Sequence, residues 1–282
     1  MRRVVLVLMT MALAVLMAGG VAQAIINGEP DRGSNAHPYV GALVTELEVA
    51  KGETELVPVC SGTLISPTVF LTAGHCTDYL IKEGLPTYVS FDPTYKPGAS
   101  TLIKGTPYLH PKYCVALKEG CVPDPIGGRL VGYPRYDVGV VVLNEPVRMA
   151  TYGALPEAGL VDTLKEGQRL TAVGYGATRF ARGDGRLPQA VYPDDRYRAT
   201  VRFLNANPDA GHMFVKTTGV SLIKREGAGT CYGDSGGPLF LPDQGTIVGV
   251  TSWGSTGSFC SGPGYYQRMD LPRVLKWVRS FP

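Results

Sequence analysis

The apolar residues of this chain fall in short runs interrupted by turns, and this pattern limits the possible folds more than any other feature. The runs are rich in Val, Leu, Ile and Tyr, while Gly (36) and Pro (22) make up a fifth of the 282 residues. Such runs are typical of an all-β sandwich or barrel. Helical spacing occurs only in Leu271–Phe281, where a terminal helix is expected. The runs are Tyr39–Val44, Thr68–Thr72, Val138–Leu143, Arg169–Tyr175, Met213–Thr217, Gly237–Leu241 and Thr246–Trp253.

The first 24 residues resemble a secretory signal rather than part of the fold. Arg2 and Arg3 precede an apolar run over residues 4–17, and residues 22–24 (Ala-Gln-Ala) form a small-x-small cleavage site. These features predict a signal peptide over residues 1–24, with a signal anchor as the weaker alternative. The protein is therefore expected to be secreted and to begin at Ile25, with cleavage after Ala22 as the alternative.

The charge balance gives no sign of a polyanionic partner. The formal net charge is +3, and removal of Arg2 and Arg3 lowers it by two. We therefore predict no binding of nucleic acid, and no membrane contact after removal of the signal. No loop shows a clear carboxylate spacing for calcium, and neither a cofactor nor a metal is predicted.

Six cysteines lie after the signal segment. An even number of cysteines in a secreted chain predicts disulfides, although spacing alone leaves 15 pairings open. A zinc site is the weaker alternative because no Cys-x-x-Cys or His-x-x-x-His spacing occurs. Two of the cysteines are seven residues apart in the loop-like segment 91–134, which suggests a locally cross-linked insertion. The cysteines are Cys60, Cys76, Cys114, Cys121, Cys231 and Cys260.

The stretch Gly233–Pro238 (Gly-Asp-Ser-Gly-Gly-Pro) places Ser235 in a glycine-rich turn. A serine hydroxyl becomes a nucleophile only when a base activates it. The stretch also fits an α/β-hydrolase elbow, but that fold needs a histidine after the serine. Every histidine here precedes Ser235. An Asp-His-Ser order would depend on Asp31, which lies in a turn-rich segment, so the order His-Asp-Ser remains. The histidines are His37, His75, His110 and His212.

His75 and Asp137 are the best candidates for the histidine and the aspartate of a His-Asp-Ser catalytic triad. His75 ends an apolar run and precedes Cys76, whereas His110 and His212 lie in loops and are expected at the surface. Asp137 stands before the apolar run 138–143, where a carboxylate entering a core needs a partner such as an imidazole. A solvated carboxylate at a strand end is the weaker alternative for Asp137. The other aspartates considered, Asp92 and Asp124, each precede a proline and fit turns.

These motifs, taken in order, resemble the chymotrypsin/trypsin-like serine proteases over Ile25–Pro282. The resemblance implies an all-β fold of two six-stranded antiparallel β-barrels with a C-terminal helix and the active site between the barrels. Residues 25–150 would form the first barrel and residues 151–282 the second. Gly74 stands where animal members usually have alanine, which suggests a bacterial member. The matching segments are residues 25–28 (Ile-Ile-Asn-Gly), 73–76 (Ala-Gly-His-Cys), 233–238 and 252–254 (Ser-Trp-Gly), with Asp137 before its apolar run.

The resemblance also implies the role of each catalytic residue. Ser235 attacks a peptide carbonyl, His75 takes the proton, and Asp137 orients the imidazole. The backbone N–H groups of Gly233 and Ser235 form the oxyanion hole. The amino group of Ile25 pairs with Asp234, so that signal cleavage itself would create the active N-terminus. Two disulfides match the family, Cys60–Cys76 and Cys231–Cys260, whereas Cys114–Cys121 has no counterpart there.

The same comparison implies an uncharged specificity pocket. Gly229 and Thr230 stand at its base, where trypsin-like members have an aspartate, so a preference for Lys or Arg is not expected. Thr251 replaces the histidine of glutamate-specific relatives. We predict a preference for apolar or aromatic side chains, although Glu226 is near enough in sequence to add negative charge. The remaining substrate-binding residues are Ser252, Trp253, Gly254 and Gly264.

The predicted partners are protein or peptide substrates and protein protease inhibitors, and the protein is expected to be a monomer. The alternative function is that of a catalytically silent, protease-like binding protein. An esterase activity using the same three residues is a further possibility.

Overall fold

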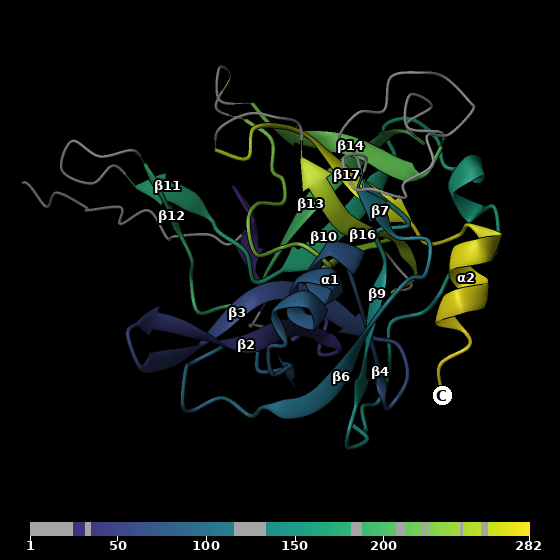
Figure 1. Cartoon of the computed structure of the whole chain (residues 1–282). Coiled ribbons are helices and arrows are strands. Elements are labelled where there is room, and N and C mark those ends of the chain that lie inside the picture. The colour runs from purple at the N-terminus through teal and green to yellow at the C-terminus, as the bar shows by residue number, and fades with distance from the viewer. Residues whose placement is uncertain are drawn as a thin grey trace, which may run out of the picture.

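The computed structural model describes residues 25–31, 35–115, 134–181, 188–206, 212–221, 224, 226–242, 245–254 and 259–282. The predicted signal peptide, residues 1–24, lies outside the described residues, and so does Cys121. Two β-barrels and two short helices make up most of the described chain (Figure 1).

The first barrel is a closed sheet of six antiparallel strands in the order β2-β3-β4-β9-β6-β5. Its core is formed by apolar side chains of these strands, and β4 is buried at every position. The strands are β2 (Val40–Ala50), β3 (Glu53–Leu64), β4 (Val69–Thr72), β5 (Tyr88–Ser90), β6 (Ile103–Leu109) and β9 (Gly139–Leu143).

The second sheet has the order β1-β13-β10-β15-β16-β17-β14, and the additional pairing of β13 with β14 closes six strands into a barrel. The predicted class, two six-stranded antiparallel barrels with a C-terminal helix, is confirmed. The strands are β1 (Glu29–Pro30), β10 (Arg169–Gly174), β13 (Tyr197–Asn205), β14 (Phe214–Val220), β15 (Pro238–Phe240), β16 (Ile247–Gly254) and β17 (Gly262–Arg268).

Smaller elements complete the described chain. These are two further pairs of antiparallel strands and a short 3-10 helix, which lies in the chain between β9 of the first barrel and β10 of the second. They are β7 (Cys114–Val115) with β8 (Pro134–Arg135), β11 (Arg179–Ala181) with β12 (Gln189–Val191), and η1 (Leu160–Thr163).

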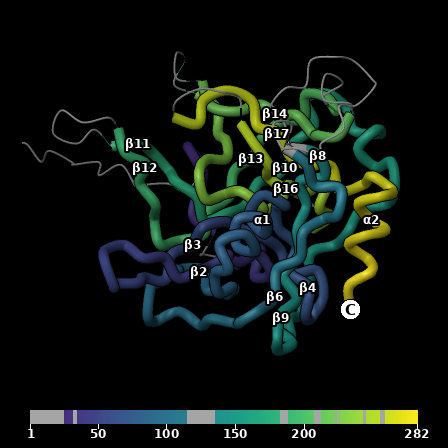
Figure 2. Tube along the Cα trace, in the orientation of Figure 1, coloured from purple at the N-terminus to yellow at the C-terminus, as the bar shows by residue number. Residues whose placement is uncertain are grey.

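The first and the last described segments each pack on the barrel that is farther along the chain from them. β1 follows Ile25 and pairs with β13 of the second barrel. The terminal helix α2 (Pro272–Val278), shorter than the expected 271–281, contributes Val274 and Val278 to the core of the first barrel. Figure 2 shows the C-terminal end beside β4 and β9, where the carbonyl of Pro282 accepts a hydrogen bond from Ser66 Oγ. The barrels are therefore joined by the first and by the last described segment.

Two expectations about local structure are wrong. The helix α1 (Gly74–Glu83) was not expected, because only Cys76, Thr77 and Leu80 of its larger side chains are buried and the apolar stripe is narrow. His110 was expected at the surface but is only 4% exposed. Its ring stacks on Tyr136 and contacts Trp277 of α2 edge-on, and burial lowers its pKa to about 4.

A fully buried ion pair between Asp31 and Arg196 holds the segment that follows Ile25 against the second barrel. Arg196 Nε donates to Asp31 Oδ2 at 2.9 Å, and neither side chain is exposed. The Arg196 guanidinium also donates to the carbonyl of Val40 and to Asn35 Oδ1. Burial by itself raises the pKa of Asp31, but His37 and Arg196 together hold it below its ordinary value. The pair therefore remains ionised and connects both barrels.

We expect Asp31→Ala to lower the free energy of unfolding by about 3–5 kcal/mol, because it leaves the Arg196 guanidinium buried without its counter-ion. The matched control is Glu29→Ala, which removes an ion pair to Arg198 from a carboxylate that is 67% exposed and is expected to cost less than about 1 kcal/mol. Urea unfolding measures both. Equal losses in the two variants would contradict the importance assigned to burial.

Candidate active site

The register of the first barrel brings His75 and Asp137 together. β4 pairs with β9 so that Thr72 lies opposite Gly139, and the same register places Asp137 opposite the turn that begins α1. The His75 backbone N–H donates to Asp137 Oδ1 at 2.7 Å, and His75 Nδ1 lies 2.9 Å from Oδ2. One carboxylate therefore fixes both the backbone and the ring of His75.

The second barrel completes the surroundings of Asp137. The carboxylate is not exposed, and Ser252 Oγ of β16 donates to its Oδ2 at 2.5 Å. Gln267 Oε1 of β17 accepts the Asp137 backbone N–H at 2.9 Å. Sequence reasoning missed Gln267, because nothing near it in the chain marks it as a partner of a residue 130 positions away.

These neighbours change the pKa of the His75 imidazole. Burial by itself lowers the pKa of His75, but the negative charge of Asp137 and its hydrogen bond raise it, with a smaller contribution from Asp78. The pKa therefore lies above its usual value. The ring remains one-third exposed, so that Nε2, the nitrogen not bonded to Asp137, is available to a reactant.

The turn that carries Ser235 is docked on the first barrel. Ser61 of β3 donates its backbone N–H to the carbonyl of Ser235 at 2.8 Å. A side chain at Gly236 would lie 2.0 Å from Thr72 Oγ1, so glycine is required where the turn touches the end of β4. The helix α1, which carries His75, begins two residues after Thr72. The turn of Ser235 therefore lies at the same corner of the first barrel as His75 and Asp137.

Asp234 is fully buried beneath this turn. Its oxygens accept the backbone N–H groups of Gly176 and Cys231, each at 2.8 Å. Burial raises the pKa of Asp234 to about 7, although these two hydrogen bonds oppose the rise. A carboxylate in this position gains strongly from a nearby cation.

The segment from Ile25 is inserted into the same region. Ile25 is fully buried in the core of the second barrel, and Ile26 forms a bridge with Gly229. Asn27 Nδ2 donates to the carbonyl of Gly227 at 2.7 Å. The start of the predicted mature chain thus lies beside the base of the predicted pocket.

A cavity of about 360 Å³ adjoins Ser235 and is lined by every predicted substrate-binding residue. A Cβ added at Gly254 would meet nothing within 4 Å, whereas one at Gly264 would touch the Tyr266 ring. Glu226 does not line the cavity; its side chain is 65% exposed and lies near Lys224. Among the described lining residues none is charged. They include Gly229, Thr230, Ser252, Trp253, Gly254 and Gly264.

The disulfides frame the site on both sides. Cys60–Cys76 joins β3 to the residue after His75, and Cys231–Cys260 crosses the wall of the cavity. Cys114 is also disulfide-bonded; its predicted partner Cys121 lies outside the described residues. Potential ligand atoms of Cys60, His75 and Cys76 lie within 4.8 Å of one another, but metal ligation needs free thiolates, and the disulfide removes them.

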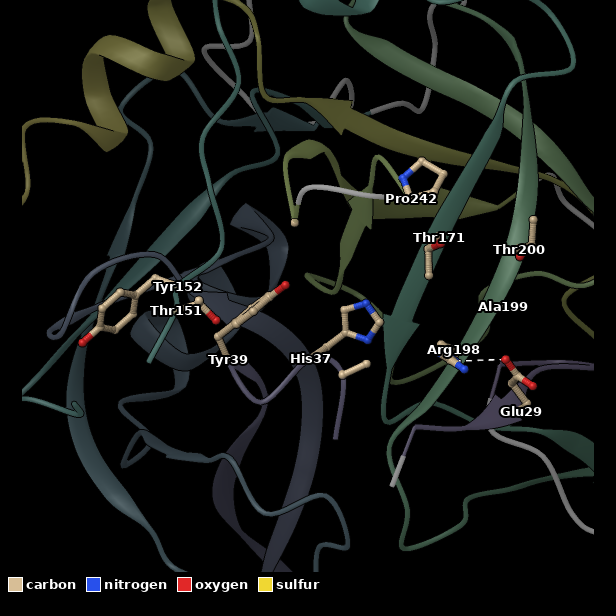
Figure 3. A pocket seen from close by; sticks show the side chains of 12 residues that line it. Glu29, His37, Tyr39, Thr151, Tyr152, Thr171, Arg198, Ala199, Thr200 and Pro242 are labelled. Atoms are coloured by element: carbon tan, nitrogen blue, oxygen red, sulfur yellow. Dashed lines mark hydrogen bonds and ion pairs between the residues drawn. The ribbon is translucent and has the colours of Figure 1, made fainter. Parts of the chain in front are cut away.

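A second cavity, of about 520 Å³, is lined by residues of both barrels (Figure 3), and Ser235 is not among its lining residues. His37 borders it, stacked on Phe240 at 5.4 Å between ring centroids, and its Nδ1 lies 3.0 Å from Asp31. The dashed line in Figure 3 marks the pair between Arg198 and Glu29. His37 therefore supports the buried Asp31–Arg196 pair rather than the Ser235 corner.

Comparison with known proteins identifies the class that this fold and this site define. The family model described as Trypsin matches residues 25–278, so the chain belongs to the trypsin family. It is 29% identical to spermosin of Halocynthia roretzi over 81% of the chain. It is 28% identical to a trypsin of Saccharopolyspora erythraea, over 87% of the chain and 93% of that protein. The chain spans 55% of spermosin and 20% of protein masquerade of Drosophila melanogaster.

Solved structures share the fold. Neuropsin, a serine protease of mouse brain, matches with a TM-score of 0.58 at 22% identity and covers 91% of this chain and 99% of its own. HL collagenase matches with a TM-score of 0.60 at 20% identity, covering 91% of this chain and 97% of its own. Among the described helices, none has the length and apolar character needed to cross a bilayer.

The bacterial origin suggested by Gly74 is not supported. Matches of 28–29% identity come from Halocynthia roretzi, Drosophila melanogaster and Saccharopolyspora erythraea alike. Local packing accounts for the glycine, since a Cβ at Gly74 would lie 2.9 Å from both the Tyr113 ring and the Val138 backbone nitrogen.

A comparison of two N-termini tests whether the Ile25 amino group reaches Asp234. In a form that retains residues 23–24, we expect the free energy of unfolding to fall by about 4 kcal/mol as the pH rises from about 4 to 7. The unfolded carboxyl loses its proton near 3.8, whereas the folded one keeps it to about 7. In the form that begins at Ile25, the ammonium group lowers the folded pKa and this loss disappears.

Urea unfolding at several pH values measures both forms, and Asp234→Asn in the longer form is the control that removes the titrating group. The same pH dependence in both forms would contradict the pairing.

Proposed function

We propose that this protein is a secreted serine endopeptidase that hydrolyses peptide bonds through an acyl-enzyme. The observation that carries the proposal is the buried carboxylate of Asp137, which lies 2.9 Å from His75 Nδ1 at the corner where the Ser235 turn is docked. Membership of the trypsin family and the relatives named kallikrein and trypsin support the same reaction.

Each residue has a defined role in this mechanism. Ser235 Oγ attacks the substrate carbonyl while its proton moves to His75 Nε2, and Asp137 stabilises the imidazolium. The backbone N–H groups of Gly233 and Ser235 bind the oxyanion. His75 then gives its proton to the leaving amine, and water attacks the ester on Ser235 in the same way to release the acid product.

We further propose that removal of residues 1–24 during export also completes the site, because it creates the active N-terminus. The new amino group of Ile25 pairs with Asp234, whose buried carboxylate has a raised pKa that a cation would relieve. This ion pair then stabilises the turn that carries Gly233 and Ser235. The mature enzyme acts as a monomer on protein or peptide substrates and is inhibited by protein protease inhibitors.

Labelling with a fluorophosphonate probe tests the proposed reaction. We expect strong labelling of protein whose N-terminus is verified as Ile25, because an activated serine attacks the probe, and no labelling of Ser235→Ala. Absence of labelling in the wild type would instead favour a catalytically silent binding protein. Mass analysis that finds another N-terminus would contradict activation by signal cleavage alone.

The pH profile tests the assignment of His75. Because the base must be neutral and its pKa is raised, we expect kcat/KM to fall as the pH decreases, with a midpoint above 6.5, the usual value for imidazole. In Asp137→Asn the midpoint should move down and kcat should drop by roughly 10⁴-fold, a magnitude carried over from this family's known chemistry. An unchanged midpoint would contradict the role of Asp137.

The base of the cavity determines the preferred side chain. We propose a preference for large apolar or aromatic residues, because no described lining residue is charged. A panel of chromogenic peptides should therefore be cleaved after Phe, Tyr or Leu rather than after Arg or Glu.

The variant Gly229→Asp is expected to gain cleavage after Arg, since a Cβ at Gly229 meets nothing closer than 3.4 Å and the carboxylate would be a counter-ion. The matched control is Gly229→Asn, which adds similar volume without charge. Cleavage after Arg by the unmodified protein would overturn the proposed preference.

A further inference from the structure

Ser61 touches the backbone of both residues assigned to the oxyanion hole. It lies in β3 next to Cys60 and is fully buried. Its backbone N–H donates to the carbonyl of Ser235 at 2.8 Å, and its Oγ donates to the carbonyl of Gly233 at 2.9 Å. A single residue of the first barrel therefore fixes two carbonyls of the nucleophile turn in the second.

The same hydroxyl also accepts a hydrogen bond. The Tyr175 backbone N–H donates to Ser61 Oγ at 3.0 Å. Tyr175 precedes Gly176, whose N–H donates to Asp234 and whose Cα would lie 2.9 Å from a Cβ at Gly233. The hydroxyl thus joins the turn to the strand end on which the turn rests.

Gly233 is the residue of this turn that most needs external support. Its φ is +93°, a conformation that glycine adopts without a steric penalty but from which it also departs easily. Because each peptide unit is planar, a fixed Gly233 carbonyl restricts rotation on one side of the Gly233 Cα. A hydroxyl at 2.9 Å from that carbonyl holds the residue whose N–H must point at the developing oxyanion.

We propose that the Ser61 hydroxyl is a positioning group for the oxyanion hole. It does not contact substrate; it acts by orienting Gly233, while the contact with Ser235 comes from the Ser61 backbone N–H, which every variant at this position keeps. This inference rests on the proposed peptidase function. This role predicts that loss of the hydroxyl lowers kcat and leaves KM nearly unchanged. A poorly oriented oxyanion donor stabilises the transition state less, whereas it hardly affects binding of the substrate ground state.

The test compares Ser61→Ala with the wild type, each in the form that begins at Ile25. Removal of the hydroxyl leaves a buried carbonyl and a buried N–H unpaired. We expect kcat for a peptide anilide to fall by about 10- to 100-fold, below the roughly 100- to 1000-fold loss that follows removal of a donor itself. KM should change less than about threefold. The affinity for a peptidyl trifluoromethyl ketone, which forms an oxyanion on Ser235, should fall in parallel with kcat.

Two further variants separate positioning from stability. Thr45→Val removes another buried hydroxyl of the first barrel, one that donates to the carbonyl of Pro86, and should destabilise the protein without changing kcat. Ser61→Thr keeps the hydroxyl and should keep at least about a third of kcat, since the group that acts on Gly233 is preserved. If Ser61→Ala does not fold, Ser61→Cys, which keeps the side-chain volume and has only a weak donor, is measured instead.

The outcomes are distinct. An unchanged kcat in Ser61→Ala, a rise in KM alone, or an equal loss of kcat in Thr45→Val would overturn the positioning role. Failure of the wild type to react with the fluorophosphonate probe would overturn the peptidase proposal itself. Loss of kcat and of ketone affinity together, with normal labelling of the wild type and retention in Ser61→Thr, is the expected result.

Discussion

The buried carboxylate of Asp137 is the interaction on which the arrangement of the site depends. A charge removed from water must be compensated by hydrogen bonds or counter-charges, and Asp137 obtains them from both barrels. His75 of α1 supplies two of these bonds and Ser252 of β16 supplies the third. Because Trp253 and Gly254 follow Ser252 and line the cavity beside Ser235, the same carboxylate connects His75 to that cavity.

The other buried aspartates follow the same rule in different ways. Asp31 has a guanidinium partner in Arg196 and keeps a low pKa. Asp270 is paired with Arg268 at 2.8 Å. Asp234 is held by backbone N–H groups, which compensate its charge less completely, and its pKa is raised. This contrast makes Asp234 the member of the set whose ionisation depends most on a cation placed near it.

Much of the site could be predicted because its residues stand in short, local patterns. A serine between glycines, a histidine before a cysteine and an aspartate before an apolar run are visible without a structure, and their order excluded two other hydrolase classes. His110 was misjudged because its cover comes from Trp277 of α2, far along the chain. Ser61, Gln267 and Arg196 gave no local sign of their partners, since each acts through a contact between the barrels.

The sequence by itself determined the strand-rich class, the identity of the reactive groups and their order, because turns and apolar alternation are properties of neighbouring residues. Only the tertiary structure decided which atoms meet. The partners of Ser61 lie 114 and 172 positions away, and those of Arg196 include Asp31, 165 positions away. These polar contacts form only when the two barrels pack against each other and remove the groups from water, so that no one segment of the sequence encodes them.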